Sequence, residues 1–334
     1  MLRRDLLDLI EAADLNALLR AVDGLCETRD WEELFDLADA CEDALERGKQ
    51  LWPISDHIDY RIALEAPGEY AAQVITPESR RFAHGPLTEV AASSHKWAEL
   101  ADHLDSPQTA AYVAQERVLR GEILEGDERA HAEVLDLPLR LESFEPTYTL
   151  AIFRADHVEV PEPWEPRAPL VDTVARAAPE IEDDAMAGAL LDLVTPWTTE
   201  SNGAARAAVV EGDAVAAASA VAGDDLRIGE LDPDEALQRM AWAAAGGGAH
   251  GRRRGAAFGR SMAWYVTGVA AGLRWPIEPP ELGRTLTELS WYRWDEGEPE
   301  RGWVLRLAVE DRNGGWAAAI GATDVLEEDE EEPA

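Results

Sequence analysis

The stretch Leu289-Ser-Trp-Tyr-Arg-Trp-Asp295 opens the part of the chain that decides the fold class. Two further runs rich in apolar residues follow it, Trp303–Glu310 and Trp316–Thr323, and the three are separated by turn residues at Glu296-Gly297 and Asn313-Gly-Gly315. Short runs of this kind, bounded by glycine-containing turns, predict consecutive β-strands. We therefore expect a small antiparallel sheet near the C-terminus.

Three helices are predicted before these strands. One starts at Asp232-Pro233-Asp234 and ends at the glycines 246–248, and the others cover about 252–272 and 279–289. Helix and strand are thus segregated along the chain instead of alternating, which argues against a doubly wound parallel sheet. The predicted class is α+β, with a mainly helical N-terminal half of helix pairs followed by a mixed domain.

One segment of the second half permits two interpretations. Ala205–Val210 and Ala214–Val221 flank Glu211-Gly212-Asp213, and this arrangement predicts a β-hairpin. The many alanines of the second run also permit a helix, because alanine has the highest helix propensity. The hairpin is the first expectation and the helix is its alternative.

Residues 2 to about 145 predict helices almost throughout. Apolar residues recur there at spacings of three and four in two stripes: Leu6, Leu9, Ile10, Ala13 and Ala17, then Trp31, Leu34, Leu37, Ala38, Cys41 and Leu45. Asp30 is the expected N-cap of the second stripe and Gly48 its stop signal. Further helices are expected over about 86–104 and 107–121.

The composition changes after this helical half. Thr147–Arg154 is rich in β-branched and aromatic residues and predicts a strand, whereas Pro161-Glu-Pro-Trp-Glu-Pro-Arg-Ala-Pro169 cannot form a helix and predicts an extended connector. The expected domains are a helical domain (1–145), a strand and Pro-rich connector (146–170), an α+β domain (171–325) and an acidic tail (326–334).

The chain is strongly acidic, with 67 Asp and Glu against 30 Lys and Arg and a formal net charge of -37. Such a charge repels phosphate backbones and anionic membranes, so we expect neither nucleic acid nor membrane as a partner. Because no run of 18 apolar residues occurs, a cytoplasmic protein is expected. Basic residues that are nearly all Arg, together with abundant Ala, are typical of a GC-rich genome, actinobacterial or haloarchaeal. The oligomeric state is left open.

Basic residues gather in Gly246-Gly-Gly-Ala-His-Gly-Arg-Arg-Arg-Gly-Ala-Ala-Phe-Gly-Arg260. The segment matches the dinucleotide-binding pattern G-x-G-x-x-G, but it follows a helix instead of a strand, so that interpretation is rejected. A helix beginning after His250 and Gly251 would offer free N–H groups to an anion beside Arg252, Arg253, Arg254 and Arg260. The alternatives are that these arginines pair with nearby carboxylates, or that they hold a small anion or an acidic segment of a protein partner.

A second candidate surface is aromatic. In a strand, Trp291 and Arg293 would point to one face of the sheet and Tyr292 and Trp294 to the other, and Trp303 on the neighbouring strand would extend either face. One face would cover core and the other would meet a helix. The alternative is a surface for stacking a ligand, with Arg293 beside it.

Motifs for other chemistry are weak. His95, Glu99 and His103 would share one stripe of a helix, but the outer two would lie about 12 Å apart along the axis, so that one ion could meet only one histidine together with Glu99. Cys26 and Cys41 lack metal-binding spacing and are interpreted as buried small side chains. No cofactor and no metal are expected.

The chain resembles an uncharacterised actinobacterial protein family of unknown function at three segments, Ala243–Arg260, Trp291–Asp295 and Gly302–Asp311. The resemblance covers mainly residues 230 to 325 and implies a bacterial cytoplasmic protein. It assigns no catalytic residue, cofactor or substrate.

The leading hypothesis for function is a non-catalytic interaction or adaptor protein whose Gly/Arg helix start binds an acidic partner segment or an anion. The alternative is an enzyme that acts on a phosphorylated or carboxylated small molecule, with Arg252, Arg253 and Arg254 holding the charge and His250 as acid or base. An enzyme requires these side chains to converge on a concave pocket.

Overall fold

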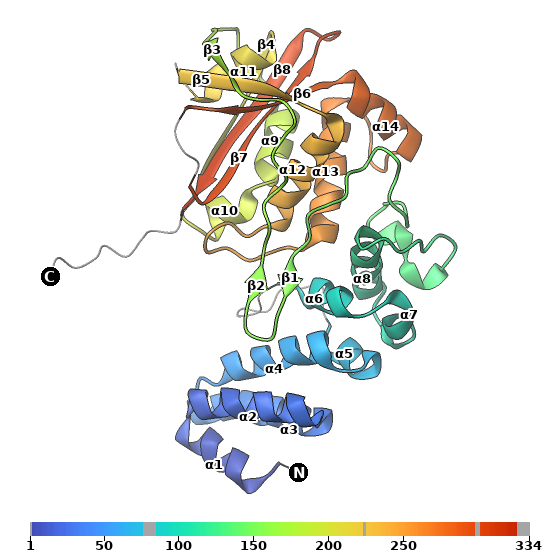
Figure 1. Cartoon of the computed structure of the whole chain (residues 1–334), viewed down its shortest axis with the longest axis vertical. Coiled ribbons are helices and arrows are strands. Elements are labelled where there is room, and N and C mark those ends of the chain that lie inside the picture. Colours follow the sequence, from blue (N-terminus) through green and yellow to red (C-terminus); the bar gives the residue numbers. More distant parts are fainter. Residues whose placement is uncertain (1, 76–84, 223–224, 298–300, 326–334) are drawn as a thin grey trace, which may run out of the picture. The chain divides into compact units, whose positions relative to one another are not determined.

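A computed structural model describes residues 2–75, 85–222, 225–297 and 301–325. Packing divides the chain into two compact units, which are described separately below. The N-terminal unit consists of residues 1–135 and 151–160, and the C-terminal unit consists of residues 136–150 and 161–334 (Figure 1). None of the helices in the described ranges is long and apolar enough to cross a membrane.

The division into units differs from the predicted domain boundaries. Residues 136–150 belong to the C-terminal unit and residues 151–160 to the N-terminal unit, so the predicted boundaries at 145 and 170 run through the units. The predicted acidic tail, residues 326–334, lies outside the described residues.

Helices dominate the N-terminal unit. They are α1 (Arg4–Ala12), α2 (Leu15–Thr28), α3 (Trp31–Asp43), α4 (Trp52–Glu65), α5 (Gly68–Val74), α6 (Leu87–Ser94), α7 (Trp97–Leu100) and α8 (Pro107–Leu119). Asp30 caps α3 by accepting a hydrogen bond from the N–H of Glu33, and Gly48 ends the following turn at a φ of 76°, as predicted. The apolar stripes are buried, with Leu34, Leu37 and Cys41 at 0% exposure.

Two predictions for this unit are corrected. The helix expected over 86–104 is interrupted at His95, which adopts an extended conformation between α6 and α7. Its ring lies within hydrogen-bonding distance of two main-chain carbonyls, Ala66 at Nε2 (2.7 Å) and Ala91 at Nδ1 (3.0 Å), and these contacts hold it out of a helix. The strand expected over Thr147–Arg154 shrinks to β1 (Ile152–Phe153), paired with β2 (Val158–Glu159).

An antiparallel sheet forms the centre of the C-terminal unit. Its strands are β3 (Val171–Val174), β4 (Ala204–Glu211), β5 (Asp225–Leu231), β6 (Ser290–Asp295), β7 (Trp303–Asp311) and β8 (Trp316–Asp324), in the order β3-β5-β6-β7-β8-β4. Every neighbouring pair is antiparallel. The three C-terminal strands predicted from sequence are thus confirmed, and so is the α+β class.

The helices of this unit are α9 (Asp184–Asp192), α10 (Thr195–Thr199), α11 (Ala214–Ala222), α12 (Pro233–Ala245), α13 (Ala256–Ala270) and α14 (Pro279–Glu288). The expected hairpin is wrong, because its second run forms α11. Asp213 accepts a hydrogen bond from the N–H of Ala216 (2.9 Å), and this contact together with the alanine-rich sequence favours a helix.

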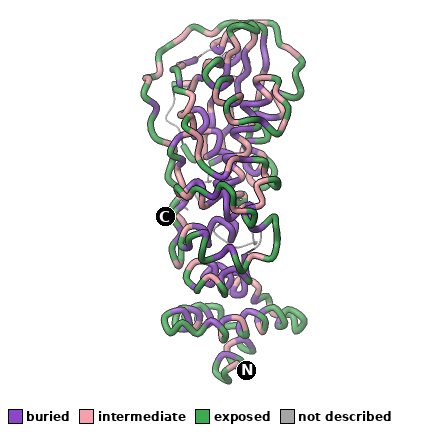
Figure 2. Tube along the Cα trace, turned by 90° about the vertical axis from the view of Figure 1, so that its right-hand side faces the viewer, coloured by how far each residue is buried: buried purple, intermediate pink, exposed green. Residues whose placement is uncertain are grey.

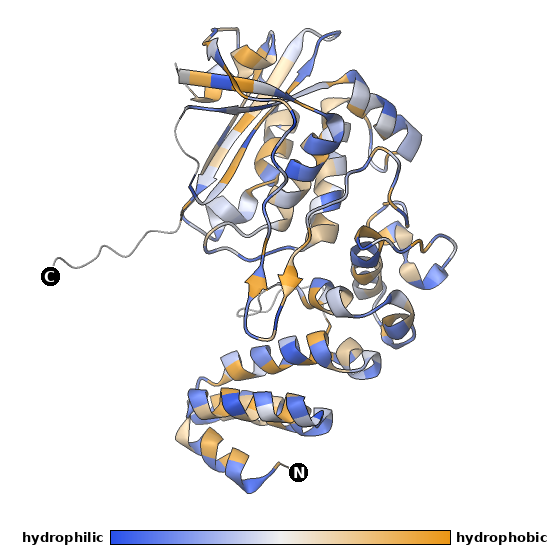
Figure 3. Cartoon of the chain, in the orientation of Figure 1, coloured by the Kyte–Doolittle hydropathy of each residue, from blue (hydrophilic) through white to orange (hydrophobic). Residues whose placement is uncertain are grey.

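The two faces of the sheet carry different helices. Helix α11, apolar in Figure 3, packs its alanines onto a face that includes Trp294 and Ala308. Trp291 belongs to the opposite face, where α9 and α12 contact the strands and α13 packs on both helices. Buried residues gather in the interior of the C-terminal unit (Figure 2). The predicted alternation of Trp291 and Trp294 is therefore confirmed, and each indole covers core.

Helices α12 and α13 approach each other closely at Gly259. A Cβ added there would lie 2.2 Å from the carbonyl oxygen of Ala241, a distance that no side chain tolerates without a shift of the helices. Gly188 of α9 also lies inside a helix, but a Cβ there would meet nothing within 4 Å.

These two glycines give a matched test of the packing. We expect Gly259→Ala to lower the free energy of unfolding by about 1–3 kcal/mol through overpacking. Gly188→Ala should raise it by about 0.4–1 kcal/mol, because alanine restricts the unfolded chain and suits a helix. Urea denaturation measures both, and a Gly259→Ala protein as stable as wild type would contradict the observed helix contact.

Candidate functional site

The arginines of the Gly/Arg segment do not begin a helix. Helix α13 starts at Ala256, four residues later than predicted, and Gly255 before it has a φ of +94° that only glycine adopts readily. The N–H of Arg254 donates to the carbonyl oxygen of Ala245 at 2.8 Å, which holds the chain in a turn at the end of α12. Arg252, Arg253 and Arg254 therefore lie outside the helical turn in which the sequence placed them.

Side chains of the protein accept hydrogen bonds from N–H groups in and directly after the glycine loop, residues 246–251. Asp324, which is 1% exposed, accepts a hydrogen bond from the N–H of Ala249 at 2.6 Å. Glu200 accepts from the N–H of Arg252 at 3.0 Å, and the hydroxyl of Ser201 accepts from the N–H of His250 at 3.2 Å. The donors predicted to receive an external anion thus already have internal acceptors.

The side chains of the segment point into different surroundings. His250 and Arg252 are exposed, whereas Arg253 is 9% exposed and Arg254 lies over the ring of Phe258 at 5.0 Å. Gly251 lies against the main chain of Gly247. The side chains of this segment therefore differ in exposure and surroundings.

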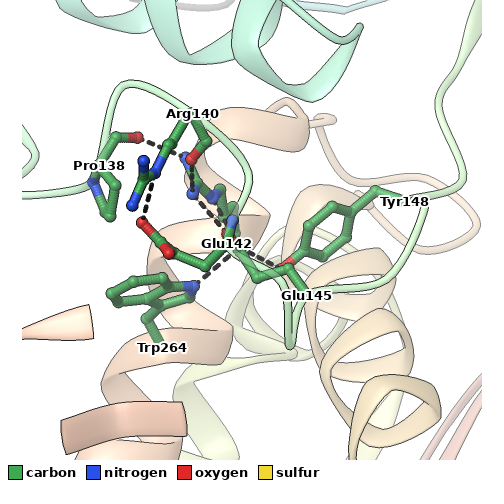
Figure 4. Close-up of polar contacts among 7 residues, drawn as sticks. Pro138, Arg140, Glu142, Glu145, Tyr148 and Trp264 are labelled. Carbon is green, nitrogen blue, oxygen red and sulfur yellow. Dashed lines mark hydrogen bonds and ion pairs between the residues drawn. The ribbon is translucent and has the colours of Figure 1, made fainter. Parts of the chain in front are cut away.

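Arg260 is fully buried and pairs with Glu145, which is labelled in Figure 4. Its Nε and Nη2 donate to the two carboxylate oxygens at 2.8 and 2.6 Å, and its remaining contacts include the carbonyls of Pro138 and Arg140. Trp264 Nε1 also donates to Glu145, at 2.9 Å. The bidentate geometry makes Arg260 a structural clasp that holds residues 136–150 against α13.

Burial would by itself raise the pKa of Glu145. The hydrogen bonds and the positive charge of Arg260 outweigh this effect and hold the pKa of the carboxyl below its usual range. Glu145 therefore stays ionised, and its pairing stabilises the fold above the pKa that it has in the unfolded chain.

Tryptophans connect the glycine loop to the sheet. Trp242 of α12 stacks on Trp303 of β7 with ring centroids 4.8 Å apart, and Trp197 meets both edge-on. A Cβ on Gly246 would lie 2.5 Å from the Trp303 ring, so the loop lies directly against this cluster. Trp291 is instead a core residue whose Nε1 donates to the carbonyl of Leu286 at 3.1 Å. Of the predicted aromatic surface, Trp303 thus joins an indole cluster and Trp291 does not.

A cavity of about 170 Å³ is lined in part by Trp242. We call it the arginine–tryptophan pocket. It is lined by Arg239 and Trp242 of α12, Arg293 and Trp294 of β6, Arg306 of β7, and part of the connector, including Glu162, Pro163 and Glu165. The sequence prediction had named Arg293 and Trp294 and placed an arginine beside an aromatic surface.

Each arginine of the pocket has a defined contact. Arg293 donates from Nη1 to Glu165 (2.6 Å) and from Nη2 to the carbonyl of Ala168 (3.1 Å), and its side chain is 15% exposed. Arg306 pairs with Glu296 at 2.8 Å and lies over the Trp294 ring. Arg239 reaches the carbonyl of Trp164. Three arginines and two glutamates, Glu162 and Glu165, thus line one small space.

Two buried donors that line the pocket lack an acceptor among the described residues. They are Nε1 of Trp242 and Nε of Arg293, both of which are removed from solvent. A buried N–H without an acceptor costs about 1–3 kcal/mol, so native structures rarely leave one unless a water or ligand completes it. Each of these two N–H groups can therefore donate to an acceptor oxygen of a water or a ligand.

Sequence reasoning missed Arg239, Trp242 and Arg306. Arg239 and Trp242 are three residues apart on α12, a spacing that places them on one helix face and that could have drawn attention to them. Nothing in the sequence indicated that the connector would lie beside that face. The described residues contain no group of His, Cys, Asp and Glu arranged to hold a metal ion.

Comparison with known proteins gives one match. The model of a family of unknown function, DUF6183, matches residues 16–325. No curated protein and no solved structure matches the chain.

Loss of the Arg260–Glu145 ion pair should have a large and pH-dependent effect on the free energy of unfolding. Glu145→Gln leaves a buried guanidinium without its counter-charge and should lower the free energy of unfolding at pH 7 by about 3–5 kcal/mol. Because the folded-state pKa of Glu145 is lowered, the contribution is complete above the unfolded pKa, about 4.3, and is lost as pH falls through the folded pKa.

Urea denaturation between pH 3 and pH 7 measures this effect. Wild type should lose stability more steeply than Glu145→Gln below about pH 4. The exposed Glu288→Gln serves as a control that should change stability by less than about 0.5 kcal/mol. Equal stability of wild type and Glu145→Gln at pH 7 would contradict the clasp.

Proposed function

The chain belongs to DUF6183, a family of unknown function, and we propose that it is a non-catalytic interaction protein whose arginine–tryptophan pocket binds an anionic group, phosphate or carboxylate. The observation that carries the proposal is the pair of buried donors, Trp242 Nε1 and Arg293 Nε, which have no acceptor in the described part of the chain. Phosphate and carboxylate supply several acceptor oxygens on one small group.

The size of the pocket supports a small group. Its volume of about 170 Å³ is below the 300–1,000 Å³ that is usual for drug-sized ligands. An inorganic anion or the charged end of a larger molecule fits this space, whereas a dinucleotide does not.

Charge supports an anion over a cation. Arg239, Arg293 and Arg306 line the pocket, and guanidinium groups bind carboxylate and phosphate oxygens in a planar, two-pronged geometry. The net charge of -37 opposes an approaching anion at long range, so binding depends on these local cations.

We place the anion in the pocket and not at the predicted Gly/Arg helix start, because Asp324 and Glu200 already accept hydrogen bonds from N–H groups there. The pocket also favours binding over the enzymatic alternative. His250, the acid or base of that alternative, is exposed and is not among the residues lining the pocket. Two buried cysteines without a disulfide, Cys26 and Cys41, support the reducing, cytoplasmic setting that we propose.

Calorimetric titration with inorganic phosphate tests the proposal. Arg293→Gln removes a charged donor and should weaken phosphate binding about 10- to 100-fold, because hydrogen bonds to charged groups contribute about 1.5–3 kcal/mol. Arg284→Gln removes an equal charge from an exposed site on α14 and should leave the affinity within about twofold. Equal weakening by both variants, or absence of binding to wild type, would refute a pocket-specific anion.

A further inference from the structure

We infer that Glu165 is a built-in competitor for the arginine–tryptophan pocket, and that an anion entering the pocket releases residues 162–165 from Arg293. This inference rests on the proposed function and adds a mechanism of regulation to it. The observation behind it is that Glu165, a pocket-lining carboxylate, is already paired with Arg293 at 2.6 Å.

The connector makes several contacts on the C-terminal side of Glu165. Pro166 is buried, and Arg167 pairs with three carboxylates near the start of α12: Asp232, Asp234 and Glu235. Pro169 lies against β5, where a Cβ on Gly229 would be 2.6 Å from its carbonyl oxygen. We therefore place any movement of the main chain before Pro166.

Residues 162–165 are held by much less. The side chain of Glu165 is 81% exposed and that of Trp164 is 71% exposed. The contacts of this stretch include the Glu165–Arg293 ion pair and the hydrogen bond from Arg239 to the carbonyl of Trp164 at 3.4 Å. An ion pair with one exposed partner contributes little, about 0.2–1 kcal/mol, so a competing charge can displace it.

Charge repulsion prevents the Glu165 carboxylate and an external anion from binding Arg293 at the same time. The guanidinium of Arg293 has a single positive charge, and Glu165 already neutralises it from Nη1. An anion accepting from the buried Nε of Arg293 would share that charge with the Glu165 carboxylate, and like charges within about 4–6 Å repel each other. The exposed carboxylate regains its hydration when it leaves, whereas the anion gains the buried donors.

Binding of an anion in the pocket thereby changes the surface of the protein. Release of Glu165 changes the position of the exposed Trp164, the largest apolar side chain of the connector. An interaction protein can in this way present a different surface with and without its anion.

Affinity provides the first test, again with inorganic phosphate as the probe. Glu165→Gln removes the competing charge and should bind phosphate about two- to fivefold more tightly than wild type. Glu162→Gln removes an equal charge from the same stretch without breaking the Arg293 pair and should have a smaller effect. If both variants bind phosphate more tightly by the same factor, the effect comes only from the lower net negative charge, and the inference is overturned.

Thiol labelling provides the second test. Pro163 is half-buried at the pocket, so Pro163→Cys reports whether the stretch opens. The native thiols give little background, because burial raises the pKa of Cys26 to about 11 and that of Cys41 to about 12. Saturating phosphate should increase the rate of labelling with iodoacetamide by about twofold or more.

The outcomes separate this inference from the proposed function. If wild type binds phosphate but Glu165→Gln binds no more tightly, or phosphate slows the labelling of Pro163→Cys, then Glu165 is not a competitor and only the inference falls. If wild type binds no phosphate, the proposed function falls and the inference falls with it.

Discussion

The buried ion pair between Arg260 and Glu145 is the interaction on which the C-terminal unit depends. Both side chains are 0% exposed, and each would be an uncompensated buried charge without the other. The pair fixes residues 136–150 against α13, and α13 in turn packs on α12 at Gly259. Since α12 carries Arg239 and Trp242, the clasp also determines where one wall of the arginine–tryptophan pocket lies.

The fold was predictable wherever local signals and tertiary packing agree. Helix α12 has a capping box at Asp232 and a glycine stop, and the last three strands alternate between turns that contain glycine. The prediction failed where a distant contact decides between local alternatives. The alanines of α11 permitted strand or helix, and His95 interrupts a helix because the carbonyl of Ala66, 29 residues away, meets its ring.

The site was harder to predict, because in an acidic chain almost any cation can find a carboxylate. The Gly/Arg segment drew attention through its composition, but only tertiary structure brings Glu145, Glu200 and Asp324 to it. Arg293 was recognised beside aromatic residues, since strand alternation is a local rule. Arg239 and Arg306 come from other elements, and the sequence carries no sign that they meet Arg293.

The central claim is that an external anion enters the pocket and not the glycine loop. Anomalous diffraction at the selenium edge, from crystals grown with selenate as a phosphate analogue, tests this most directly. We expect a selenium peak in the arginine–tryptophan pocket, with oxygens at hydrogen-bond distance from Trp242 Nε1 and Arg293 Nε. A peak at the loop of residues 246–251 instead, or an empty pocket at selenate concentrations that saturate binding in solution, would contradict it.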